Sequence, residues 1–237
     1  MPLERVPWSE LEPYFLNNWG WPEGQWQPEH LAITGPTGSG KSFLGTHLLH
    51  QRAVKGGAHC VVLATKPADS TVKRLTTKEK GWKLRRTWPP EYSENRVIYW
   101  PPSGKPGEGN AKQRQAIFNM LDEMWKPDAN IIVMFDEIAY VEEELRLRPL
   151  ITKYWREART LGITLVATTQ RPRGVSRYMH SEPSWSIAFK PQDLDDMRRV
   201  AEILGNREFI PDIMDLQRRE FILCKKVTGE AYISQLK

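Results

Sequence analysis

Short apolar runs alternate with amphipathic stretches along most of the chain. Six runs predict buried β-strands, at residues 31–34, 60–65, 96–100, 131–135, 163–168 and 185–189. Apolar residues at helical spacing predict helices between them, at residues 41–54, 111–125, 142–161 and 193–204. Strands that alternate with helices in this way indicate an α/β fold built on a mainly parallel sheet.

The last part of the chain has a different pattern. Residues 221–225 and 231–234 are strand-like and flank Thr228-Gly229, which predicts a C-terminal β-hairpin. A length of 237 residues, of which 40% are hydrophobic and 27% charged, suits one globular domain with short arms. We therefore expect an N-terminal arm at residues 1–29 and a single α/β domain at residues 30–237.

A glycine-rich turn joins the first predicted strand to the first predicted helix. The segment Gly35-Pro36-Thr37-Gly38-Ser39-Gly40-Lys41-Ser42 matches the pattern G-x-x-x-x-G-K-[ST] in full. Glycines let successive backbone N–H groups surround a phosphate, and the following helix adds the positive end of its dipole. Lys41 supplies a charge for the β- and γ-phosphates, and the Ser42 hydroxyl is a magnesium ligand. The sequence thus predicts a site for ATP and Mg²⁺.

The strand at residues 131–135 leads directly into two acids, Asp136 and Glu137. Its apolar run indicates burial on both faces, so the acids should emerge at the edge where α/β sheets bind ligands. We expect Asp136 to hold the magnesium and Glu137 to polarise the attacking water. Two acids that merely cap the next helix are the alternative, and the complete phosphate loop argues against it.

Two other nucleotide-using classes fit the sequence less well. A nucleotide kinase also needs a phosphate loop, but it adds a lid and an acceptor site, and no clear candidate exists for either. A guanine-specific GTPase is disfavoured because no N/T-K-x-D pattern follows a late strand. ATP hydrolysis is therefore the predicted reaction.

The first 29 residues stand apart in composition. They carry several prolines and four tryptophans, which are Trp8, Trp19, Trp21 and Trp26. The simplest expectation is an arm that packs on the sheet. The alternatives are an arm that closes over the nucleotide base or one that docks on a neighbouring subunit.

The net charge of +5 is unevenly distributed. Residues 66–86 carry +6 and residues 146–177 carry +7, which leaves −8 on the rest of the chain. Two basic segments on an acidic body suggest a polyanionic partner, whereas plain solvated lysines and arginines are the alternative.

Cysteine usage and hydropathy bear on location. Cys60 and Cys224 lie in apolar, strand-like surroundings, which favours two buried thiols over a disulfide. No apolar run approaches the roughly 18–20 residues that cross a bilayer, and the N-terminus lacks the basic start and apolar stretch of a secretory signal. The expectation is a cytoplasmic protein.

Residues 156–172 join a helix to the fourth core strand, with the sequence Arg-Glu-Ala-Arg-Thr-Leu-Gly-Ile-Thr-Leu-Val-Ala-Thr-Thr-Gln-Arg-Pro. Arg156 and Arg159 project away from the apolar stripe of the helix. Each is therefore either a solvated charge or an arginine finger that reaches the nucleotide of a neighbouring subunit. Gln170 ends the strand, where an uncharged amide can sense the γ-phosphate and orient water.

This stretch closely resembles the FtsK–HerA superfamily of DNA-pumping ATPases. Eight positions match the segment of its cell-division translocases, namely Arg159, Gly162, Ile163, Leu165, Thr169, Gln170, Arg171 and Pro172. Thr164 departs from the pattern, since the family often has His there. With the phosphate loop and the acidic strand end, the resemblance covers about residues 31–190. It implies a RecA-like domain with sheet order 5-1-4-3-2, in which the strand of Gln170 lies between those that precede Lys41 and Asp136.

Viral packaging ATPases of this superfamily also look similar after the second strand, where a basic loop touches the DNA backbone. That resemblance implies that Lys66, Lys73 and Arg74 bind double-stranded DNA through its phosphates, without regard to sequence. A chain of this size, with no membrane segment, accessory domain or nuclease domain, resembles the packaging ATPases of bacterial and archaeal viruses. The resemblance implies a ring, pentamer or hexamer, that acts at a viral portal or capsid vertex in the host cytoplasm.

Two other functions stay open. The chain could be a plasmid or chromosome DNA translocase, of the conjugation or segregation type, that borrows its anchor from a partner. It could also be a nucleotide-switched regulatory module that moves no DNA. Glu137 and Gln170 argue against such a switch, since both suit turnover.

Overall fold

The computed structural model describes residues 2–19, 27–89, 94–104 and 109–236. Its strands are β1 (Glu4–Arg5), β2 (Leu31–Thr34), β3 (His59–Leu63), β4 (Lys83–Arg85), β5 (Arg96–Tyr99), β6 (Ile131–Asp136), β7 (Ile163–Thr169), β8 (Trp185–Phe189), β9 (Glu220–Lys225) and β10 (Glu230–Gln235). Its α-helices are α1 (Trp8–Asn18), α2 (Lys41–Lys55), α3 (Ser70–Lys73), α4 (Ala111–Met124), α5 (Ile138–Glu142), α6 (Arg148–Glu157), α7 (Tyr178–Ser181), α8 (Leu194–Leu204) and α9 (Ile210–Asp215). None of the helices in the described ranges is long and apolar enough to cross a membrane.

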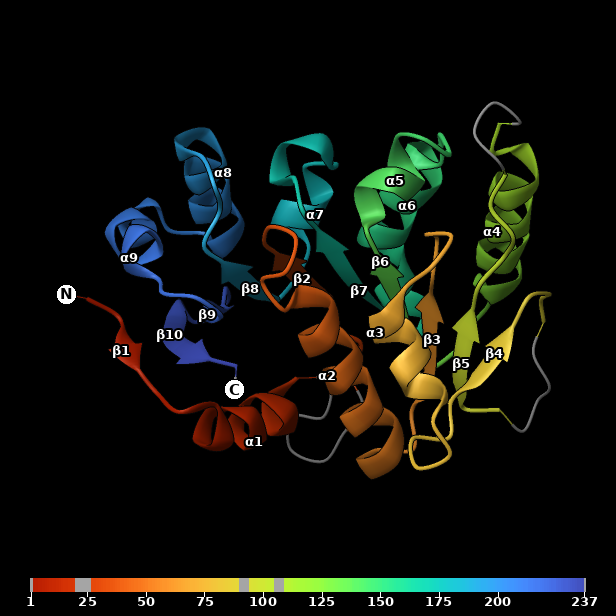
Figure 1. Ribbon diagram of the computed structural model, residues 1–237, viewed down its shortest axis with the longest axis horizontal. Coiled ribbons are helices and arrows are strands. Elements are labelled where there is room, and N and C mark those ends of the chain that lie inside the picture. Colours follow the sequence, from red (N-terminus) through yellow and green to blue (C-terminus); the bar gives the residue numbers. More distant parts are fainter. Residues whose placement is uncertain (1, 20–26, 90–93, 105–108, 237) are drawn as a thin grey trace.

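All ten strands form one sheet in the order β1-β10-β9-β8-β2-β7-β6-β3-β5-β4 (Figure 1). The five strands β8-β2-β7-β6-β3 are mutually parallel and have the predicted order 5-1-4-3-2. The RecA-like α/β architecture is thereby confirmed. Because β7 pairs with both β2 and β6, the ends of these three strands meet at one edge of the sheet.

Helices cover both faces of the sheet (Figure 1). Side chains from α1, α2 and α3 pack against one face, and side chains from α4, α5 and α6 pack against the other. Within β2, Leu31 and Ile33 join the first cluster and Ala32 joins the second. A strand buried on both faces needs apolar residues at every position, which is why the core strands have continuous apolar runs.

The sheet continues on both sides of this core. The C-terminal hairpin of β9 and β10 is antiparallel, as predicted, and β9 pairs with β8. On the other side, β5 and then β4 continue the parallel order beyond β3. The sequence pattern predicted no strand between residues 66 and 95, so β4 is an additional strand. The three residues of β4, Lys-Leu-Arg, form a short charged edge strand, and such strands lack an apolar signal.

The described part of the N-terminal arm packs on the sheet, as expected. Leu11, Phe15 and Trp19 are buried within the same cluster as the core strands. The ring of Phe15 lies 5.0 Å from that of Trp185 in β8, and β1 pairs with β10. Trp21 and Trp26 lie outside the described residues.

The helix predicted over residues 142–161 is interrupted. Helix α5 ends at Glu142, α6 begins at Arg148, and a 3₁₀ turn, η3 (Ala158–Leu161), follows it. Pro149 lies in the first turn of α6, where its missing N–H costs nothing, whereas within a continuous helix its ring would clash with the preceding turn. The break turns the chain at Arg146, whose φ is 53°.

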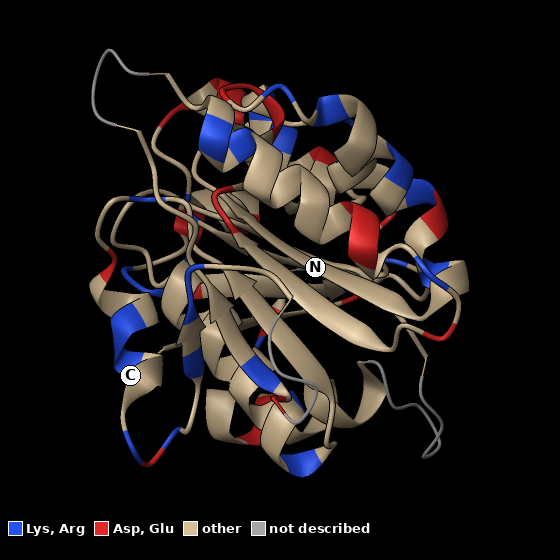
Figure 2. Ribbon diagram, turned by 90° about the vertical axis from the view of Figure 1, so that its right-hand side faces the viewer, with Lys and Arg blue, Asp and Glu red and all other residues tan. Residues whose placement is uncertain are grey.

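Both cysteines are free and buried, as predicted. Charged residues lie mostly on the outer helices and loops, where basic and acidic positions alternate (Figure 2). Part of the charge of residues 146–177 is neutralised within the fold, since Arg148 pairs with Glu143 and Arg173 pairs with Asp195.

His30 ties the start of β2 to α6 and β7. It is completely buried, and its Nδ1 accepts a hydrogen bond of 3.0 Å from the backbone N–H of Leu165. Its Nε2 then carries the proton and donates to the carbonyl of Trp155, at 3.2 Å. Burial, with a smaller effect of the Arg159 charge, lowers the pKa of His30 to about 3. His30 is therefore neutral in the folded protein.

The neutral His30 predicts a specific loss of stability in acid. In the unfolded chain its pKa is about 6.5, so the unfolded state takes up a proton that the folded state refuses. The free energy of unfolding that the neutral His30 contributes is complete above about pH 6.5. It falls by about 1.4 kcal/mol per pH unit as the pH drops toward 3. Urea unfolding of the wild type and of His30→Gln should show a stability difference that shrinks by about 2 kcal/mol between pH 7 and pH 5. His180 titrates in both proteins, so its effect cancels in the stability difference between them. A difference that does not change with pH would contradict this account.

Candidate active site

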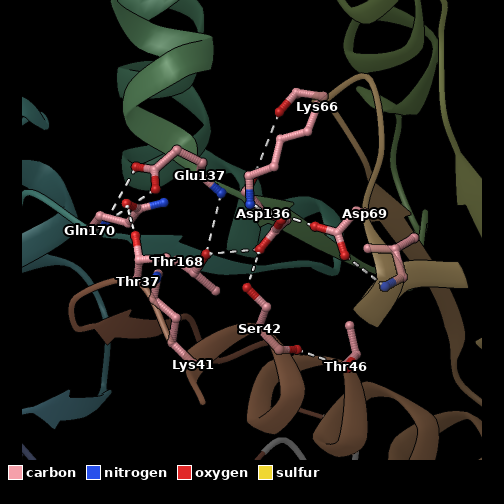
Figure 3. Close-up of polar contacts among 12 residues, drawn as sticks. Thr37, Lys41, Ser42, Thr46, Lys66, Asp69, Asp136, Glu137, Thr168 and Gln170 are labelled. Carbon is pink, nitrogen blue, oxygen red and sulfur yellow. Dashed lines mark hydrogen bonds and ion pairs between the residues drawn. The ribbon is translucent and has the colours of Figure 1, made fainter. Parts of the chain in front are cut away.

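The carboxyl ends of β2, β7 and β6 bring the predicted site residues together (Figure 3). Thr34, the last residue of β2, is opposite Thr169 in β7, and Asp136, the last residue of β6, is opposite Thr168. The phosphate loop, Gln170 and the acidic pair therefore leave the sheet side by side.

The phosphate loop turns sharply between β2 and α2. At its end Gly40 has φ 109°, and a Cβ there would lie 2.7 Å from Leu236, so only glycine fits without strain. Lys41 opens α2, and its buried ammonium donates a hydrogen bond of 3.2 Å to the carbonyl of Pro36. Burial lowers the pKa of Lys41, while the charges of Glu137 and Asp136 act in the opposite direction. The lysine thus folds back over its own loop.

Asp136 lies at the centre of the polar contacts. Its Oδ1 accepts a hydrogen bond of 2.6 Å from Ser42 and one of 3.4 Å from Thr168, and its Oδ2 lies 2.9 Å from the Lys66 ammonium. Burial alone would raise the pKa of Asp136, but Lys66 and Ser42 together bring it below its usual value. Asp136 is therefore an ionised carboxylate. Its contact with the Ser42 hydroxyl joins two hard oxygen donors, the kind of ligand that Mg²⁺ prefers.

Glu137 is held in a strained conformation. Its φ of 82° is in the left-handed region, where a residue with a side chain typically costs about 1–3 kcal/mol. Its backbone N–H donates to the Thr168 hydroxyl at 3.2 Å. Its carboxylate accepts hydrogen bonds from the Thr169 hydroxyl at 3.0 Å and from the Gln170 N–H at 3.2 Å. Burial raises the pKa of Glu137, although Thr169 and Lys41 oppose this. A positioned carboxylate with a raised pKa is suited to accept a proton.

Gln170 connects the two halves of the site. Its Oε1 accepts a hydrogen bond of 2.7 Å from the hydroxyl of Thr37 in the phosphate loop, while its N–H binds Glu137. The amide and the carboxylate are thus fixed relative to each other and to the loop.

Lys66 points into the site. The family resemblance implies that it binds DNA with Lys73 and Arg74, and in this structure its ammonium faces Asp136 and also lies 3.6 Å from Asp69. The two carboxylates attract it into the site. Lys73, in α3, and Arg74, in the following 3₁₀ turn η2 (Arg74–Thr76), are exposed.

Arg156 and Arg159 are exposed and lie away from the phosphate loop of their own chain. Arg159 lies beside the amino end of β7, and the seven residues of that strand place Gln170 roughly 20 Å away. The Arg156 guanidinium lies 5.7 Å from the centre of the Tyr178 ring. An action of either arginine on a nucleotide would therefore be expected in a neighbouring subunit.

Two clefts flank the phosphate loop. One, of about 640 Å³, extends toward the loop after β7 and is lined in part by Thr37, Gln170 and Arg171. The other, of about 620 Å³, extends toward the turn before β9, with Gly38 and Arg218 in its lining. Both have the size of sites that bind small ligands.

No family model matches the sequence, and no curated protein matches it. Solved structures do. The genome packaging NTPase B204 from Sulfolobus turreted icosahedral virus 2, in complex with sulfate, is 14% identical, with a TM-score of 0.65 over 90% of this chain and 98% of that one. VirB4 of Thermoanaerobacter pseudethanolicus is 9% identical, with a TM-score of 0.65 over 88% of this chain and 89% of that one. The pCW3 conjugation coupling protein TcpA is 19% identical, with a TM-score of 0.57 over 88% and 60%.

The chain has the RecA-like fold of P-loop ATPases. B204 has also been solved with AMP, with AMPPCP and with ATP-gammaS.

No role was predicted for the two threonines that end β7, although Thr169 is one of the positions that match the family segment. Thr168 joins Asp136 to the backbone of Glu137, and Thr169 holds the carboxylate of Glu137. Consecutive hydroxyls at the end of an apolar run, one residue before Gln170, were the available signal. Their side chains point to opposite sides of the strand, so the Thr168 hydroxyl reaches the carboxylate of Asp136 and the Thr169 hydroxyl reaches that of Glu137.

The two functions of the site, phosphate binding and water activation, should be separable. Lys41→Ala should lose nucleotide binding by at least about tenfold, because the ammonium next to the loop is removed. Glu137→Gln should bind the nucleotide normally and slow hydrolysis by roughly 10²–10⁴-fold, the usual contribution of a general base. Fluorescent-nucleotide binding and phosphate release measure the two effects.

The matched control is Glu144→Gln, the same substitution at an exposed position. It should leave both measurements at the wild-type value. Near-normal hydrolysis by Glu137→Gln would show that this carboxylate is not the base.

Proposed function

We propose that the chain is an ATPase of the FtsK–HerA type that moves double-stranded DNA, as the genome-packaging motor of a virus. The observation that carries the proposal is the way Glu137 and Gln170 are held beside the phosphate loop. The Thr169 hydroxyl and the Gln170 N–H bind the Glu137 carboxylate, and the Gln170 side chain binds Thr37 of the loop. A carboxylate and an amide fixed at this point serve turnover, which nucleotide binding alone does not require. The fold shared with the packaging NTPase B204 supports the same proposal.

The roles of the residues follow from their contacts. Residues 35–42 surround the phosphates of ATP, and Lys41 contributes the charge. Ser42 and Asp136 would hold Mg²⁺, which neutralises charge on phosphate oxygens when it is bound. Glu137 takes a proton from the attacking water, and Gln170 orients that water and senses the γ-phosphate.

Exposed basic residues supply the contact with DNA. Lys73 and Arg74 lie on the surface of a segment with a net charge of +6, and they bind backbone phosphates without reading sequence. Subunits assemble as a ring, a pentamer or hexamer, in which Arg156 reaches the nucleotide of its neighbour. A portal or capsid vertex is the partner that a packaging ring needs.

Conjugative DNA transfer is the second candidate. The conjugation coupling protein TcpA has the same fold, and its identity to this chain, 19%, is no lower than that of B204. A nucleotide-switched module that moves no DNA is a third candidate. The bond between Glu137 and Gln170, with Gln170 held to Thr37 of the loop, argues against it.

The motor function predicts that double-stranded DNA of any sequence stimulates the ATPase. The double variant Lys73→Gln/Arg74→Gln should lose most of this stimulation. It should also bind unrelated sequences equally weakly, with a salt dependence flatter by about one unit of slope per lost contact. Phosphate release and fluorescence anisotropy over a salt series measure these effects.

The control is Arg198→Gln/Arg207→Gln, which removes two exposed charges elsewhere. It should keep the wild-type slope. Failure of any DNA to stimulate the wild-type enzyme would favour the nucleotide switch.

The arginine finger predicts that activity returns when two inactive variants are mixed. Glu137→Gln keeps its Arg156, and Arg156→Ala keeps its Glu137, so a mixed ring contains junctions where both are intact. Such a finger is worth roughly 10³–10⁵ in rate, so the mixture should clearly exceed either variant alone. Steady-state phosphate release measures this, after sizing of labelled mixtures has shown that subunits exchange.

The same mixture with Arg159→Ala tests the second arginine. If subunits exchange and only the Arg159→Ala mixture recovers, Arg159 is the finger. Recovery in neither mixture would mean that the arginines act within their own subunit or are only surface charges.

A further inference from the structure

Lys66 is a second lysine of the site, and its ammonium lies between two carboxylates (Figure 3). It is 2.9 Å from Oδ2 of Asp136 and 3.6 Å from Oδ2 of Asp69. Burial would lower the pKa of Lys66, but Asp136 and Asp69 outweigh it and raise that pKa. Lys66 therefore remains a cation, held at the carboxylate that would bind magnesium.

This contact and a divalent cation compete for one carboxylate. Ser42 and Thr168 contact Oδ1 of Asp136, and Lys66 contacts Oδ2, so both oxygens are engaged. A divalent cation held by Ser42 and Asp136 would lie within a few ångströms of the Lys66 ammonium. Asp136 is only 3% exposed, so water and salt screen this repulsion weakly. The two arrangements therefore oppose each other.

The geometry lets the side chain of Lys66 move while its backbone stays in place. The carbonyl of Lys66 accepts a hydrogen bond of 2.7 Å from Trp100 Nε1, and that of Thr65 accepts one of 3.0 Å from Gln113. The Lys66 side chain is 38% exposed, and its four-carbon stem is flexible. Release of the ammonium thus needs only rotation of side-chain bonds.

Lys66 also lies at the start of the segment proposed to bind DNA. Its second partner, Asp69, caps α3 by accepting a hydrogen bond of 2.9 Å from the N–H of Val72. Lys73 and Arg74 follow in the next residues. A lysine that leaves Asp136 therefore adds its charge to the same surface.

We propose that Lys66 is a positioning residue that occupies Asp136 until a divalent cation binds with the nucleotide, and that it then turns outward to contact DNA. The second half of this inference rests on the proposed contact with DNA, and the first half rests only on the proposed magnesium site at Ser42 and Asp136. Lys66 would thereby make the charge of the DNA-binding surface depend on the nucleotide.

Cation binding tests the first half without DNA. Magnesium is titrated into each protein with a fluorescent, non-hydrolysable ATP analogue. Lys66→Met removes the competing charge, so its midpoint should fall by about three- to tenfold, as expected for one partly screened ion pair. Lys66→Arg keeps the charge and should stay near the wild-type midpoint. Lys73→Met, a lysine of the same segment outside the site, should not change it. An unchanged midpoint in Lys66→Met would overturn the proposal, and so would a higher one, which would mean that Lys66 binds the nucleotide.

DNA affinity tests the second half. Anisotropy with a labelled duplex compares each protein with magnesium and the analogue against the same protein with neither. The wild type should bind more tightly with both, and Lys66→Met should lose that gain. Lys73→Met should weaken binding in both conditions and keep the ratio. A gain that persists in Lys66→Met would overturn the release of Lys66 toward DNA. If the wild type binds no duplex in either condition, the proposed function and the second half fail together, while the magnesium midpoint still decides the first.

Discussion

β7 lies between β2 and β6. The hydrogen bonds that join Asp136, Glu137 and Gln170 to Ser42, Thr168, Thr169 and Thr37 cross one of these two pairings or bridge both. Thr168 and Thr169 project to opposite sides of the strand. A slip of one residue in either pairing would exchange these sides and place each hydroxyl against the wrong partner. The apolar residues of β7 are buried on both faces, which makes such a slip costly. The burial of β7 therefore determines which hydroxyl contacts which acid at the edge of the sheet.

Asp136 and Glu137 are both buried, but their neighbours shift their pKa values in opposite directions. Both carboxylates are largely removed from water, which by itself raises the pKa of each. Lys66 reverses that shift at Asp136, whereas hydroxyl and amide donors only moderate it at Glu137. Asp136 is thus kept ionised, as a group that binds cations must be, and Glu137 is a stronger base. Neighbouring carboxylates acquire different roles when their surroundings differ in this way.

The core of the fold could be predicted from the sequence because the signals that indicate it are local. Apolar runs mark the core strands, and the phosphate loop and the Thr-Thr-Gln-Arg-Pro segment identify the edge where they end. The family resemblance supplied the strand order, which sequence periodicity alone does not contain. The position of Lys66 could not be predicted, because a long side chain at a strand end can reach solvent or fold inward, and only the place of Asp136 decides between them. The charged strand β4 was missed because it lacks an apolar run. The break before Pro149 was missed although the proline was itself a local signal for it.

The direction of helix α6 determines where Arg156 lies relative to the edge of the sheet that carries the phosphate loop. Helix α6 begins at Arg148, near the end of the sheet that carries the phosphate loop, and Arg148 binds the carbonyl of Gly174 there. The helix then runs back, and at about 1.5 Å per residue Arg156 lies roughly 12 Å further along it. If Arg156 acts on a neighbour, the surface that presents it differs from the surface that receives it. The two surfaces can lie in one self-complementary patch, which gives a two-fold dimer, or on different faces, which gives a heterologous contact. The ring that we propose needs the heterologous contact, which repeats from subunit to subunit until it closes.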